Sequence, residues 1–138
     1  MDEQIRQFTQ AIGATEPTPD DDTFKLWKTV FKRSHYFRFD KKYMIVKISR
    51  SKRPFWGVGK QFIDLLNSRD DYYLVLLCSG REGWFFRKVE INANIRIKKW
   101  NLREKDNNYK INFPLPDRNS FFSPENFLKK AAVNAACI

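Results

Sequence analysis

Hydrophobic residues recur at helical spacing along several segments of the chain. Ile5, Phe8 and Ile12 lie three and four residues apart, which places them on one face of a helix. Gly13 follows directly and is typical of a helix end. By such spacing, or by capping signals, four helices are predicted: residues 3–12, 24–31, 60–66 and a segment that starts at Ser123, Pro124 and Glu125.

Other segments are apolar in alternation with polar residues, or apolar without interruption. Strands are predicted over residues 36–39, 43–49, 72–78, 84–87 and 109–113. The first two are separated by the three residues 40–42, which suit the tight turn of a β-hairpin. The run 72–78 is typical of a central strand that is buried on both faces and parallel to a neighbour. Residues 50–59 are predicted to be a loop, and residues 89–100 fit either a helix or a strand.

These elements predict an α/β protein with a mixed β-sheet flanked by helices. The length of 138 residues favours a single domain, 1–138. Within it we expect an N-terminal helix and acidic linker (1–22), an α/β core (23–113) and a C-terminal loop and helix (114–138). The chain begins without the basic and apolar stretches of a signal peptide and contains no run of about 20 apolar residues. We therefore expect a cytoplasmic protein with no membrane span.

A cluster of positive charge lies in the first half of the chain. Residues 24–60 contain twelve Lys or Arg and one acid, a balance of +11 in a chain whose total is +10. The same segment holds nine aromatic residues. Cations interleaved with aromatics suit a polyanion with stackable faces, so nucleic acid is the expected partner. The alternative is that the aromatics belong to the core and the cations cover a solvated surface.

The basic loop predicted after the second strand is the strongest candidate contact with nucleic acid. Its Arg side chains can hold phosphate oxygens through two donors, and Gly57 and Gly59 allow close approach of a bulky ligand. The adjacent Phe55 and Trp56 either stack on a base or anchor the loop in the core. The predicted nucleic-acid-binding residues are Arg33, His35, Arg50, Lys52, Arg53, Phe55, Trp56 and Lys60.

The order helix, strand, strand, helix, strand, with Lys47 in the second strand, resembles the core of the PD-(D/E)xK, or restriction-endonuclease-like, nuclease superfamily. In that family two carboxylates hold Mg²⁺ and the Lys stabilises the attacking water or the charge on phosphate. The resemblance covers about residues 24–90. It implies tentative catalytic roles for Asp40, Lys47 and Gln61, with Asp40 as a metal ligand. Ile45 stands where the family has its motif Glu, so the implied metal site is incomplete.

A nucleic-acid-binding domain with a nuclease-like fold and an incomplete metal site is therefore the expected function, and the resemblance implies DNA as the nucleic acid. Two alternatives stay open. An active Mg²⁺-dependent endonuclease would need a displaced carboxylate, for which Asp64 and Glu16 are the candidates. A protein-interaction subunit of a nucleic-acid-processing complex would present the same basic face to an acidic protein partner or to a second copy of the chain.

Overall fold

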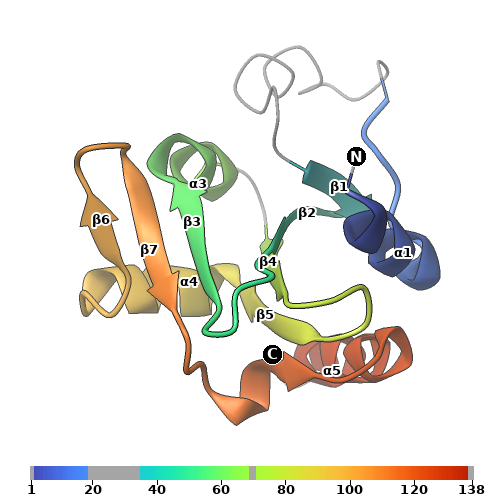
Figure 1. The fold of residues 1–138 in the computed structure, drawn as a ribbon. Coiled ribbons are helices and arrows are strands. Elements are labelled where there is room, and N and C mark those ends of the chain that lie inside the picture. Colours follow the sequence, from blue (N-terminus) through green and yellow to red (C-terminus); the bar gives the residue numbers. More distant parts are fainter. Residues whose placement is uncertain (1, 19–34, 69–70, 137–138) are drawn as a thin grey trace.

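The computed structural model describes residues 2–18, 35–68 and 71–136, which form an α/β fold with two β-sheets (Figure 1). Its helices are α1 (Glu3–Ile12), α3 (Lys60–Asn67), α4 (Lys88–Arg96) and α5 (Pro124–Ala136). The first sheet has the order β1 (His35–Phe39), β2 (Lys42–Ile48), β4 (Tyr72–Leu77), β5 (Gly83–Arg87) and β8 (Ser120–Phe121). The second sheet has the order β3 (Phe55–Gly59), β7 (Asn108–Asn112) and β6 (Asn101–Arg103). A 3-10 turn, η1 (Asp117–Asn119), precedes β8.

The predicted α/β class with a mixed sheet and flanking helices is confirmed. The helix predicted over residues 24–31 lies outside the described residues. The restriction-endonuclease-like core stays a prediction.

The predicted hairpin is confirmed, with a turn one residue shorter than expected. β1 and β2 pair antiparallel, and Phe39 lies opposite Lys42. Asp40 and Lys41 alone form the turn, both with positive φ, at 50° and 63°. Two such residues match the right-handed twist of the flanking strands, so Lys42 already belongs to β2.

The central strand is the one predicted from the continuous apolar run. Every residue of β4 is buried, and the strand pairs parallel to β2 on one side and antiparallel to β5 on the other. Because both faces of β4 are covered, neither face needs polar residues, which explains the absence of alternation in its sequence.

The structure corrects three expectations about the segments after β2. Phe55–Gly59 form the edge strand β3, so the prediction of a loop through residue 59 is wrong. The segment predicted as a last strand is β7, but the short β8 follows it. The ambiguous segment 89–100 is helical up to Arg96 in α4 and is followed by β6, which the sequence pattern did not indicate.

Two hydrophobic clusters hold these layers together. On one face of the first sheet, α1 and α5 pack over an aromatic group centred on Phe127, which is fully buried. Its ring lies 5.0 Å from that of Phe85, 5.3 Å from Phe121 and 5.4 Å from Phe8. The opposite face packs against the second sheet, α3 and α4. Figure 1 shows α1 and α5 together on one side, and α4 behind β6 and β7.

Among the described residues, no helix is long and apolar enough to cross a membrane.

Candidate nucleic-acid interface

Phe55 and Trp56 are neighbours in β3 but face opposite sides of the second sheet. Trp56 is only 3% exposed, and its indole Nε1–H donates to the Leu77 carbonyl oxygen at 3.1 Å. Its ring also meets Trp84 edge-on, with the ring centroids 5.7 Å apart. Phe55 is 52% exposed on the other face. Trp56 therefore anchors the strand in the core, as one of the two readings of this pair expected, whereas Phe55 is accessible.

Alternation along β3 and β7 gives the second sheet one apolar and one polar face. Trp56 and Val58 of β3, with Tyr109 and Ile111 of β7, are buried against the core. The residues between them point away from α4, and we call the surface that they form the outer face. It consists of Phe55, Gly57, Gly59, Asn101, Arg103, Asn108, Lys110 and Asn112.

The strand register sets these residues in three rows across the outer face. Phe55 lies opposite Asn112. Gly57 lies opposite Lys110, which lies opposite Asn101 on β6. The third row joins Gly59, Asn108 and Arg103 in the same order. Paired residues of an antiparallel sheet project to the same side of the sheet. Each row therefore brings residues from neighbouring strands together on one surface.

The two glycines make the β3 edge of this surface shallow. A methyl group at Gly57 would lie 3.5 Å from Asn108 Nδ2 and 3.8 Å from Lys110 Nζ. A methyl group at Gly59 would lie 3.3 Å from the Phe62 ring of α3 and 3.5 Å from Asn108 Oδ1. The Asn108 amide therefore lies across both glycines, and a donor and an acceptor sit close to bare backbone.

Cations gather on the side of the molecule formed by the second sheet. Residues 50–64 and 96–112, which contain this sheet and its connections, hold ten Lys or Arg and three acids. Residues 2–16, which contain α1 on the far side of the first sheet, hold one Arg and three acids. The segments that contain the second sheet therefore carry a net charge of +7, and the segment that contains α1 carries −2.

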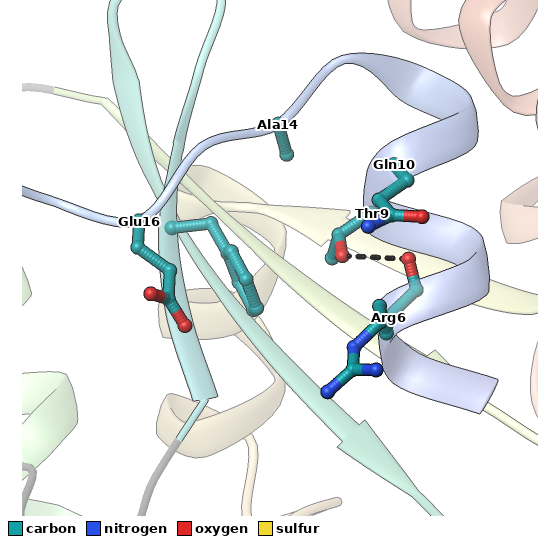
Figure 2. Close-up of a pocket in the computed structure, with 6 residues that line it drawn as sticks. Arg6, Thr9, Gln10, Ala14 and Glu16 are labelled. Carbon is teal, nitrogen blue, oxygen red and sulfur yellow. Dashed lines mark hydrogen bonds between the residues drawn. The ribbon is translucent and has the colours of Figure 1, made fainter. Parts of the chain in front are cut away.

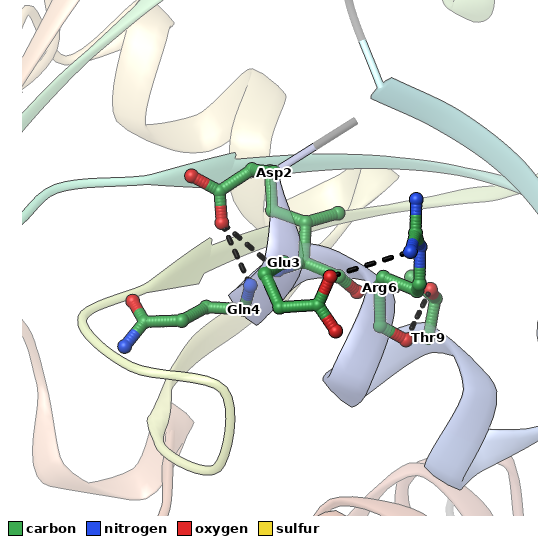
Figure 3. Close-up of polar contacts among 6 residues, drawn as sticks. Asp2, Glu3, Gln4, Arg6 and Thr9 are labelled. Carbon is green, nitrogen blue, oxygen red and sulfur yellow. Dashed lines mark hydrogen bonds and ion pairs between the residues drawn. The ribbon is translucent and has the colours of Figure 1, made fainter.

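Within the described residues, some of these cations form ion pairs and others do not. Arg50 pairs with Asp2, whose carboxylate also accepts the Gln4 and Ile5 N–H groups at the start of α1 (Figure 3). The Arg50 guanidinium lowers the pKa of the Asp2 carboxyl, so this pair is charged at neutral pH. Arg50, predicted to bind phosphate, is therefore held toward α1.

Lys60 is also paired, with Asp64 one helical turn later at 2.6 Å. Lys52 and Arg53 are exposed in the connection that leads into β3, and neither forms a salt bridge within the described parts of the chain. On β6 and β7, Arg103 and Lys110 share the Asp106 carboxylate at 2.8 and 3.8 Å. Two cations on one carboxylate leave a net positive charge there.

Lys47 lies near the end of β2 and is half-buried. Its side chain shares a face with Tyr43 and Ile45, and its Nζ lies 5.5 Å from the centroid of the Phe62 ring on α3. Burial lowers the pKa of the Lys47 amine, because a charged amine is poorly solvated there.

Replacing Lys47 by Met is expected to stabilise the fold at neutral pH, by about 1 kcal/mol. The folded pKa is lower than the unfolded value of 10.5, so the cost of burying the charge is complete below the folded pKa. It disappears as the pH rises through the folded pKa to the unfolded value. The advantage of Lys47→Met over the wild type should therefore shrink between neutral pH and pH 10.5, as measured by urea unfolding. Lys52→Met, at an exposed position, is the control; a pH-independent advantage for Lys47→Met would contradict the account.

The structure does not bring the tentative catalytic residues together. Asp40 sits in the hairpin turn beside Lys42, at 3.5 Å, whereas Lys47 is five residues further along β2 than Lys42. At about 3.3 Å per residue this separates Asp40 from Lys47 by roughly 17 Å along the strand. Gln61 is exposed, and its neighbour Phe62 is the residue that Lys47 approaches. No group of three or more His, Cys, Asp or Glu side chains converges in the described residues.

Arg33 and His35 are the two remaining residues that were predicted to contact nucleic acid. Arg33 lies outside the described residues, and His35 is the first residue of β1. β1 is an edge strand of the first sheet, so His35 is not part of the second sheet that carries the outer face.

A separate pocket of about 370 Å³ lies beside α1 (Figure 2). Arg6 and Gln10 of α1 face it from one side and Glu16 from the other, with Phe37 of β1 also in its lining. The pocket combines one cation with one carboxylate, so it has no charge preference for phosphate. It is not part of the outer face.

Comparisons of the chain with protein-family models, with curated proteins and with solved structures give no match. A functional conclusion therefore depends on the geometry and chemistry described above.

The sequence reasoning missed the contribution of β6 and β7. Asn108, Lys110 and Asn112 alternate with the apolar Tyr109 and Ile111, a pattern typical of a strand with one polar face. The signal that would have found the outer face is the matching alternation of Phe55, Gly57 and Gly59 around Trp56 and Val58, concealed by the two glycines.

Proposed function

We propose that this protein binds nucleic acid through the outer face of its second sheet and the connection formed by residues 50–54. The observation that carries the proposal is the juxtaposition on this surface of Lys110, Arg103, exposed amides and exposed Phe55, with Lys52 and Arg53 at one end of β3. Cations supply affinity for phosphate, and amides and an aromatic ring supply contacts with bases.

DNA is the polymer that we propose, because the element order resembles a superfamily of DNA nucleases. The resemblance is used only to choose DNA among the polyanions that such a surface could bind. Cleavage is not part of the proposal, since Asp40 is distant from Lys47 and Ile45 occupies the position of the motif Glu.

Removing the charges of Lys52, Arg53 and Lys110 together, by substitution with Ala, is expected to weaken DNA binding at least about tenfold at 0.1 M salt. Each lost phosphate contact also reduces the slope of log affinity against log salt by about 0.7 to 0.9, so the slope should fall by about 2 to 3. Fluorescence anisotropy of a labelled oligonucleotide across a salt series measures both quantities.

A matched triple variant provides the control. Arg6, Arg81 and Lys129 lie on α1, on the β4–β5 turn and on α5, and their replacement by Ala removes the same charge away from the outer face. This variant is expected to keep the wild-type slope within about 1. Equal losses in the two variants would show that binding follows net charge alone and would refute the assigned surface. An acidic protein partner that binds while no nucleic acid does would favour the interaction-subunit alternative.

A further inference from the structure

We infer that the ligand of the outer face is a single strand of nucleic acid, with one base stacked on Phe55. This rests on the proposed function and specifies the state of the polymer. It follows from the shape of the surface and from the kind of group that the surface exposes, and charge alone would not distinguish the two states.

The outer face is broad and shallow, which does not suit the grooves of a duplex. The major groove admits a helix or a two-stranded ribbon, whereas this surface spans three paired strands and has glycine at two positions of its edge strand. The β6–β7 hairpin is the one part of the sheet narrow enough to enter a groove. Its tip, residues 104–107, holds two acids and Lys105, so it lacks the concentrated positive charge that a groove lined by phosphates favours.

The Phe55 ring can stack on a base only where that base is unpaired. Its ring is 52% exposed on a surface that is otherwise polar, and a base in a duplex is already stacked on both sides. A single strand can turn a base onto the ring without breaking a pair, and aromatic stacking of this kind is tolerant of base identity. The cross-strand neighbour of Phe55 is Asn112, whose exposed side chain stands beside the position of a stacked base.

Amides repeat along the same surface at Asn112, Asn108 and Asn101. Each Asn side chain has an NH₂ group that donates hydrogen bonds and a carbonyl oxygen that accepts them. These groups match the Watson–Crick edge of an unpaired base. Gly57 places no side chain on β3 beside Asn108, so a planar base can approach this amide closely. Lys110 and Arg103 lie in the adjacent rows, within reach of the phosphates that connect such bases.

The test compares single-stranded DNA, single-stranded RNA and duplex DNA of one sequence, each about 12 nucleotides long, by anisotropy. Either single strand is expected to bind at least about tenfold more tightly than the duplex. Phe55→Leu keeps an apolar side chain but removes the stacking ring, and it should weaken single-strand binding by about fivefold or more without changing duplex binding. Phe122→Leu is the control, since Phe122 is 70% exposed beside α5 and should have no effect.

Gly57→Ala adds an independent variant at the same surface. A methyl group here meets its nearest neighbour at an ordinary contact distance of 3.5 Å, so thermal unfolding should match that of the wild type. Single-strand affinity should fall by about twofold or more, because the methyl group stands between the strand backbone and an approaching base.

The outcomes separate this inference from the function on which it rests. Duplex binding that is as tight as single-strand binding, and insensitive to Phe55→Leu, overturns the inference and leaves nucleic-acid binding in place. No binding of any of the three polymers at low salt overturns both. A preference for DNA or for RNA among the single strands identifies the polymer, and either preference supports the inference.

Discussion

Trp56→Ala is expected to destabilise the fold by about 3–5 kcal/mol, the range for removing a large buried aromatic ring. The ring is 3% exposed, packs against Trp84 and lies in the core between the two sheets. Nothing that remains can fill the space of an indole, because the surrounding backbone belongs to paired strands. Guanidinium unfolding monitored by circular dichroism should show a lower midpoint with an unchanged slope.

Trp56→Phe distinguishes an anchor from a ligand contact. It keeps a ring in the core and loses the hydrogen bond to the Leu77 carbonyl, which still accepts from the Ser49 N–H at 3.0 Å. The expected loss is therefore only about 1 kcal/mol, and nucleic-acid affinity should equal that of the wild type. A well-folded Trp56→Phe protein with the binding defect expected of Phe55→Leu would show that the indole contacts ligand.

Elements whose pattern is local were predictable from the sequence. The periodicity of α1 and the continuous apolar run of β4 each report burial directly, and both elements are where the pattern placed them. The hairpin of β1 and β2 was predictable because its turn chemistry is contained in a few residues.

β3 and β6 were not predictable because nothing local distinguishes them from loop. β3 has glycine at two of its three outward positions, and β6 is a three-residue strand that is exposed throughout. Both depend on pairing with β7, which for β3 is some fifty residues away along the chain. Such pairing is a property of the tertiary structure and leaves little trace in either segment alone.

The sequence predicted which kinds of residue the candidate site contains, but it identified only some of the residues that the structure places on the surface. Lys52, Arg53 and Phe55 are exposed next to one another, as the basic loop required. Arg50 is held by Asp2, a residue 48 positions earlier, and this contact could not be inferred from spacing. Trp56 faces inward because a strand, unlike a loop, sends adjacent side chains to opposite sides.

The concentrated positive charge of residues 24–60 does not form one surface in the described part of the chain. Arg38, Lys41 and Lys42 lie at the hairpin end of β2, whereas Lys52 and Arg53 follow its other end, about 20 Å away along a strand of seven residues. On the second sheet, Lys110 lies one row and Arg103 two rows along from Phe55, so these two cations share the outer face with the exposed ring. The proposed interface is thus assembled from two segments of the chain. The charge of either segment alone is smaller than the charge of the whole interface.

Gly83→Ala is expected to destabilise the protein by about 3 kcal/mol or more, although it adds only one methyl group. The added Cβ would lie 2.2 Å from the Leu76 carbonyl oxygen and 2.9 Å from Leu77 Cα. Both are backbone atoms of the central strand β4, so no side-chain rotation relieves the overlap and β4 must separate from β5. Gly57→Ala is the matched control, because its Cβ meets nothing closer than 3.5 Å. A midpoint of thermal unfolding for Gly83→Ala within about 2 °C of the wild type would contradict the close approach of these strands.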